Sequence, residues 1–192
     1  DFYEAPERVD RLLDIIAELI VDVALFVRQR TGRCSISVNR MVERVDPGLF
    51  LHANCSVQMM SPASYRALHL PREQGMASRI QPFGIHHCGD NAHKMAAAYA
   101  ELPVCYLEVG WGSDAAACRE ALPDAFLNLR LNPVRMLQAT PGEIAQDMER
   151  LLMAAGSLQQ VGVCCINMDH GTLDENIWAM FEVVQRYRRF GA

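Results

Sequence analysis

The stretch Phe83-Gly84-Ile85-His86-His87-Cys88-Gly89-Asp90 decides the fold, because an apolar run ends there in metal-binding residue types and turns directly into a helix-forming segment. His86 and Cys88 are two residues apart, so they share one face of a strand and can reach one metal ion at its end. An imidazole and a thiol form a borderline-soft donor pair that suits zinc. Gly89 permits the turn, and Asp90 is a good helix N-cap. This stretch therefore predicts a metal-binding strand end followed by a helix.

A second strand near the C-terminus offers further thiols. Residues 161–167 read as a buried strand that carries Cys164 and Cys165 and continues through the turn 169–171 into a capped helix. Adjacent strand residues face opposite sides, so only one of the two cysteines can face a given site. Two strand ends that converge on one point indicate a parallel barrel or sheet, whose sites lie at the carboxyl ends of the strands.

Length and composition predict one globular domain over residues 1–192. Hydrophobic residues make up 51% of the 192 residues, enough for a sizeable core. A net charge of −5 and a pI near 5.7 argue against a nucleic-acid or anionic-membrane surface. The seven cysteines are odd in number and lack framework spacing, which is typical of reduced thiols in a cytoplasmic protein. We also expect neither a signal peptide nor a membrane span, since no run reaches about 18 apolar residues.

Helical and strand patterns alternate along the chain. Predicted helices cover residues 6–30, 61–70, 72–80, 91–101, 114–122, 140–155 and 173–189. Predicted strands cover 49–55, 83–88, 104–108, 125–131 and 161–167, and 33–45 reads as a short strand or extended loop. Thr140 with Glu143, and Thr172 with Glu175, have the capping-box spacing. This alternation predicts a parallel sheet with right-handed crossovers.

The number of strand-helix units limits the possible architectures. We find about five such units, whereas a closed (β/α)8 TIM barrel needs eight and about 250 residues. The alternatives are an open sheet and the C-terminal part of a barrel. The long opening helix has no strand before it, which favours the barrel: an α/β fold of the TIM-barrel type to which this chain supplies roughly the C-terminal five units.

Several segments resemble, in order, the uroporphyrinogen decarboxylase superfamily. They are Met60-Ser-Pro-Ala-Ser-Tyr-Arg66 with Leu70-Pro71, His86-His-Cys-Gly-Asp90, Thr140-Pro-Gly-Glu-Ile144 and Gly171-Thr-Leu-Asp-Glu-Asn-Ile177. The match covers nearly the whole chain and the C-terminal half or more of that family's barrel. Within the superfamily, the His-x-Cys-Gly turn is similar to the zinc-dependent corrinoid:thiol methyltransferase branch.

The resemblance implies a set of site residues. Zinc would be held by His86, Cys88 and Cys165, with Cys164 and His170 as rivals for the third position. Glu108, at a strand end, is a candidate carboxylate ligand of the resting site. His170 is also a candidate fourth ligand or a hydrogen-bond donor to a ligand. We assign Glu108 and His170 as the catalytic candidates.

The implied activity is the activation of a small thiol by zinc for methyl transfer from a corrinoid (cobalamin) presented by a partner protein. A homo-oligomer or a separate N-terminal barrel half is the expected structural partner. One alternative is a decarboxylase-like lyase without metal, which would bind an anionic tetrapyrrole through arginines. Another is a non-catalytic relative that keeps the fold.

Overall fold

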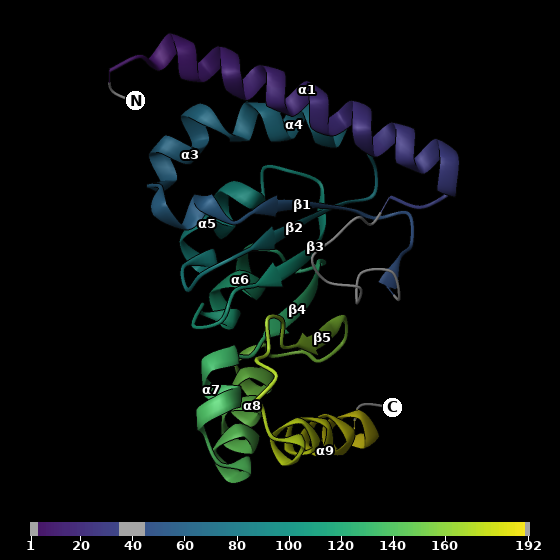
Figure 1. Cartoon of the computed structure of the whole chain (residues 1–192), viewed down its shortest axis with the longest axis vertical. Helices are drawn as coiled ribbons and strands as arrows, with labels where there is room; N and C mark the ends of the chain where they lie inside the picture. The colour runs from purple at the N-terminus through teal and green to yellow at the C-terminus, as the bar shows by residue number, and fades with distance from the viewer. Residues whose placement is uncertain (1–3, 35–44, 191–192) are drawn as a thin grey trace.

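A parallel sheet with helices packed along it forms the centre of the computed structural model, which describes residues 4–34 and 45–190 (Figure 1). Its strands are β1 (Phe50–Asn54), β2 (Phe83–His87), β3 (Val104–Val109), β4 (Phe126–Arg130) and β5 (Val161–Cys164). They lie in the sheet in their sequence order, and each neighbouring pair is parallel. In a (β/α)8 barrel the strands lie side by side in their sequence order, whereas in a doubly wound sheet the order of the strands reverses partway across the sheet. In the described part of the chain, β1 and β5 each pair on one side only.

Helices lie beyond the β1 edge of the sheet, against one of its faces, and beside β4 and β5. They are α1 (Pro6–Thr31), the 3-10 helix η1 (Ser56–Met59), α3 (Pro62–Leu68), α4 (Leu70–Arg79), α5 (Ala92–Tyr99), α6 (Ala115–Ala121), α7 (Pro133–Gln138), α8 (Pro141–Ala154) and α9 (Asp174–Phe190). The long helix α1 lies along α4 beyond the β1 edge, and α7, α8 and α9 gather beside β4 and β5 (Figure 1). No helix within the described ranges is both long and apolar enough to cross a membrane.

Local sequence accounts for where several helices begin. The side chains of Ser61, Asp114, Asn132 and Thr140 each accept a hydrogen bond from a backbone N–H of the first helical turn. These bonds satisfy donors that the helix leaves free. Thr140 and Glu143 complete the predicted capping box.

Most predicted elements are confirmed, with four differences. The 3-10 helix η1 was not predicted. The short helix α7 was not predicted: it begins directly after the predicted strand 125–131, where Asn132 caps it and Pro133 is its first residue. The last strand ends at Cys164 instead of continuing to residue 167. The second capping box is wrong: α9 begins at Asp174, so Thr172 lies too early to cap it, and its hydroxyl has no hydrogen-bond partner among the described residues. The predicted segment 33–45 lies largely outside the described residues.

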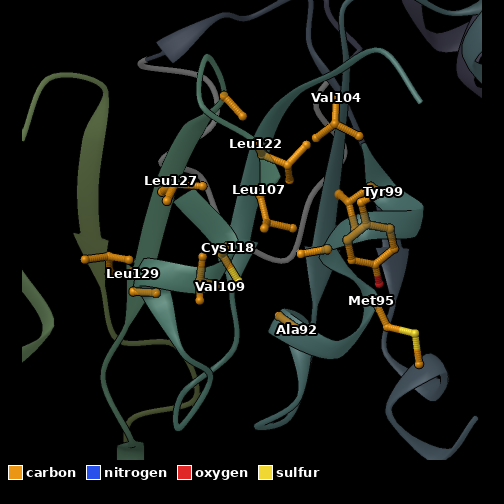
Figure 2. Packing of buried hydrophobic residues seen from close by; sticks show 14 of the residues in the cluster. Ala92, Met95, Tyr99, Val104, Leu107, Val109, Cys118, Leu122, Leu127 and Leu129 are labelled. Atoms are coloured by element: carbon orange, nitrogen blue, oxygen red, sulfur yellow. The ribbon is translucent and has the colours of Figure 1, made fainter. Parts of the chain in front are cut away.

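The two faces of the sheet have different roles. Leu107, Leu127 and Leu129 on one face pack against the helices, and Figure 2 shows them next to Cys118 and Leu122 within this main core. The opposite face carries a smaller apolar cluster. Its members are Leu49, Leu51, Tyr106 and Phe126. Two residues further along β3 and β4, toward their carboxyl ends, this second face becomes polar.

Candidate metal centre

Three polar side chains lie side by side on the second face of the sheet. The strand register pairs His86 with Glu108 and Glu108 with Asn128. All three are almost completely buried. The Nδ1 atom of His86 forms a short hydrogen bond with the Glu108 carboxylate. The other Glu108 oxygen lies 3.4 Å from the Tyr106 hydroxyl and 3.5 Å from the Asn128 amide, which position the carboxylate.

Two thiols join this row from the loops that follow β1 and β2. Asn54 and His87 pair as the last residues of their strands, so Cys55 and Cys88 leave the sheet side by side. Their Sγ atoms are 3.3 Å apart, and the Nε2 atom of His86 lies 3.0 Å from the Cys88 sulfur. The donor atoms of Cys55, His86 and Cys88 all lie within 4.8 Å of one another.

Two glycines allow the loop after β2 to take this position. Gly89 has a φ of +85°, a left-handed conformation that favours glycine. At Gly110, which follows β3, an added Cβ would lie 1.9 Å from the Gly89 carbonyl oxygen and 2.8 Å from that of His87. The backbone at the end of β3 therefore contacts the backbone of the Cys88 turn directly. A side chain at position 110 would prevent this contact.

His87 has a structural role on the other side of β2, as expected from strand alternation. Its Nδ1 atom lies 2.7 Å from the Tyr99 hydroxyl, and its Nε2 atom lies 2.8 Å from the Asn91 side-chain oxygen. The Asn91 amide in turn donates to the backbone carbonyl of Gln58. This chain of bonds fixes the turn that carries Cys88 to α5 and η1.

The ionisable groups of the cluster shift one another's pKa values. Burial lowers the pKa of His86, but the hydrogen bond and charge of Glu108, with Cys88, outweigh burial and raise it. At Cys88 burial raises the pKa, whereas hydrogen bonding with Cys55 and the charge of His86 prevail and lower it. Burial and the neighbouring Cys88 raise the pKa of Cys55 to about 11. Cys88 is therefore the more acidic thiol of the pair.

One cation stands beside the cluster. Arg130, the last residue of β4, is 4% exposed, and its guanidinium lies 3.8 Å from the Cys88 sulfur and 3.5 Å from the His87 carbonyl oxygen. No carboxylate of the described residues forms an ion pair with it, and its Nε atom has no hydrogen-bond partner there. Its positive charge favours the thiolate form of Cys88.

The donor set of this cluster fits zinc. Two thiols and one imidazole are the ligand types that zinc prefers, and three protein ligands leave one position open for a substrate. Glu108 holds the Nδ1 side of His86, so Nε2 faces the sulfurs. A carboxylate that orients a ligating histidine in this way is a common feature of zinc sites.

The other predicted ligands lie apart from this cluster. Cys164 is on the same face of the sheet as Asn128, whose amide nitrogen lies 3.3 Å from its sulfur. Cys165 packs against the main core, and burial raises its pKa to about 11. The His170 side chain is fully exposed, with its Nδ1 atom 3.1 Å from Asp169. The structure thus brings His86 and Cys88 together and does not bring Cys164, Cys165 or His170 to them; the ligand roles of those three stay predictions.

Glu108 supports His86 in this structure, and its role as a ligand or catalytic group also stays a prediction. Cys55 was missing from the predicted ligands. The available signal was its position directly after a strand, the same position that Cys88 occupies after the next strand. Recognising the pair requires the register of β1 against β2, which the sequence alone does not supply.

Comparisons with known proteins bear on the fold. No model of a known family matches the sequence, and no curated protein matches it either. A solved structure described as a methyltransferase from Methanosarcina mazei is similar, with 22% sequence identity and a TM-score of 0.59. The match covers 79% of this chain and 45% of that chain, so this chain spans less than half of its length. At this identity the likeness concerns the fold: the parallel sheet and its helices follow an arrangement that a methyltransferase also has.

Proposed function

We propose that this protein is a zinc-dependent methyltransferase that moves a methyl group from a corrinoid on a partner protein to a small thiol. The observation that carries the proposal is the cluster of Cys55, His86 and Cys88 at the carboxyl ends of two parallel strands. This is the edge of such a sheet at which substrates bind. The fold shared with a methyltransferase adds support. From the sequential order of the five parallel strands we infer that the sheet belongs to a (β/α)8 barrel.

Zinc, when bound, lowers the pKa of a thiol and keeps it as a nucleophilic thiolate near neutral pH. In the net reaction the thiol loses its proton to solvent, and its sulfur forms a bond to the methyl carbon. The corrinoid of the partner protein would serve as the methyl donor and would keep the electron pair of its bond to the methyl carbon. The chain's own contribution is to position the thiol and to supply soft donors, whereas a site of carboxylates would favour water as the nucleophile.

Each residue near the cluster has a defined part in this proposal. Cys55, His86 and Cys88 are the donors. Glu108 keeps the proton of His86 on Nδ1, so the lone pair of Nε2 faces the sulfurs. Arg130 adds a positive charge that offsets the anionic sulfurs. We further propose a cytoplasmic location, in keeping with seven cysteines that are all free thiols.

The third donor can be decided by measuring bound zinc. We expect the purified protein to carry about one zinc ion per chain and the variants C55S and C88S to lose most of it, as measured by elemental analysis. C165S is the matched comparison, because it changes the thiol that the family resemblance assigns. Loss of zinc in C165S but not in C55S would contradict the assignment of Cys55, and full zinc in C88S would contradict the site itself.

A further inference from the structure

The two thiols of the candidate metal centre are close enough to react with each other. Their sulfur atoms are 3.3 Å apart, whereas a disulfide bond is about 2.05 Å long, so an approach of about 1.2 Å joins them. Both residues lie in loops just beyond their strands, where side-chain rotation can supply this movement. Cys55 is exposed, so a small oxidant in solution can reach the pair.

The other cysteines lie elsewhere in the fold, and Cys165 packs against the main core. Cys34, Cys118 and Cys164 are buried, and Cys105 is exposed but lies at the opposite end of β3 from Glu108. The sulfur of Cys105 contacts a backbone carbonyl, that of Phe83, at 3.3 Å. The hydrogen bond between Cys88 and Cys55 brings two sulfur atoms into direct contact.

We propose that Cys55 and Cys88 form a redox switch, in which a peroxide joins them as a disulfide and thereby abolishes metal binding. This inference rests on the proposed function, because it assumes that the same two sulfurs hold the metal. A disulfide sulfur no longer offers a thiolate, and the thiolate is the form that binds zinc. Oxidation would leave His86 as the one donor of the three, which is too few to retain the ion.

The chemistry balances with hydrogen peroxide as the oxidant. One thiol attacks a peroxide oxygen, breaks the O–O bond and becomes a sulfenic acid, with release of one water. The second thiol attacks that sulfur, the S–S bond forms, and the hydroxyl group leaves with the second thiol's proton as another water. In total the two thiols lose two electrons and two protons, and the peroxide is reduced to two waters. A small dithiol reverses the reaction by thiol–disulfide exchange.

Peptide mapping and zinc release test the switch together. Zinc-loaded protein is treated with hydrogen peroxide, free zinc is followed with a chromogenic chelator, and peptides are mapped by mass spectrometry without reduction. We expect a linked peptide pair containing Cys55 and Cys88, zinc release in proportion to it, and recovery of zinc binding after reduction. Metal-free protein should form the same link faster, since the sulfurs are then unprotected.

Variants separate the possible outcomes. C55S and C88S should form no linked pair, whereas C105S, which removes an exposed thiol outside the cluster, should behave as the wild type. The switch is overturned if each sulfur is oxidised separately to a sulfinic acid, or if the linked pair forms while zinc stays bound. Wild-type protein that binds no zinc before any oxidant is added would instead overturn the proposed function, and the switch with it.

Discussion

Glu73 is a carboxyl group enclosed between β1 and α4, close to the loop that carries Cys55. Its two oxygens accept hydrogen bonds from the Asn54 amide at 2.9 Å and from the Tyr65 hydroxyl at 2.6 Å. Burial nevertheless dominates and raises the pKa of Glu73 from 4.5 to about 7. His52 lies 3.6 Å away, and burial lowers its pKa to about 4. Both groups are therefore neutral in the folded protein at mildly acidic pH.

These pKa values predict how stability depends on pH. Between pH 4.5 and 7 the unfolded chain releases the Glu73 proton while the folded chain keeps it, so Glu73 makes the free energy of unfolding fall as pH rises. His52 acts oppositely between pH 4 and 6.5, because its folded form stays neutral while the unfolded form is protonated. E73Q removes the first effect and leaves the second. Denaturant titrations from pH 4 to 8 should show the free energy of unfolding of E73Q rising by about 3 kcal/mol relative to the wild type as pH rises. A constant difference would mean that the pKa of Glu73 does not change on folding.

The sequence places a site residue correctly when the residues that it contacts are close to it in the chain. His86 and Cys88 lie in one strand and turn, so their spacing placed them together correctly. Cys55 depends on β1 pairing with β2 in one particular register, and a shift of one residue would turn its side chain to the other face. Cys164 lies beside Asn128 on the second face of the sheet, and Cys165 packs against the main core on the other face. Strand alternation predicts that the two thiols face opposite sides, but it does not say which thiol faces which side.

At the scale of elements, the end of β3 and the loop after β2 act as one unit. Gly110 allows the two backbones to touch, and this contact places the Cys88 turn beside the loop that carries Cys55. The Gln58 side chain, from η1, lies on the other side of Gly89. The sulfur pair therefore depends on packing between three elements as well as on the residues that carry the sulfurs.

The variant G110A tests this dependence. Its methyl group would overlap backbone atoms that cannot rotate away, so the loop must shift, and overpacking of this kind costs about 1 to 3 kcal/mol. We expect a lower free energy of unfolding by denaturant titration and weaker zinc retention in a chelator competition. G142A is the control, because an added Cβ there meets nothing within 4 Å and the site lies in the first turn of α8. Unchanged stability and zinc retention in G110A would show that the contact does not hold the loop.

Elements were predicted well where one signal was strong. The helical spacing of apolar residues in α1 and the capping box of α8 each predicted the bounds of a helix to within a residue or two. The predicted helix starts were wrong where a proline or a threonine is compatible with two different local structures. Asn132-Pro133 can end a strand or start a helix and here does both, and Thr172 has the capping spacing although α9 starts after it.

At the scale of the whole molecule, α1 leaves much of its apolar surface uncovered. Its buried positions are Ala17, Val21 and Ala24, and α1 packs along α4. A second stripe of large apolar side chains faces away from α4, and its members are between 42% and 65% exposed. They are Leu12, Ile15, Ile16, Leu19, Val23 and Phe26. Exposed apolar surface of this extent marks an interaction site or an aggregation liability.

The open edges of the sheet also favour association with other chains. β1 and β5 present unpaired backbone groups on one side each within the described chain, and parallel sheets are normally covered on both faces and both edges. The barrel inferred under the proposed function would remove both edges, because closure pairs the first strand with the last. A chain that exposes them, together with the α1 stripe, has a strong physical reason to associate.

We therefore expect the isolated 192-residue chain to form species heavier than its 21.5 kDa monomer. Sedimentation velocity over a range of concentrations measures this directly. L19E places a charge in the middle of the α1 stripe, where the side chain is 61% exposed, so it should shift the distribution toward monomer without unfolding the helix. M153E is the matched control, since Met153 is 72% exposed on α8, outside the stripe, and its replacement should leave association unchanged. A compact 21.5 kDa monomer of the wild type at every concentration would contradict the prediction and favour a self-sufficient open sheet.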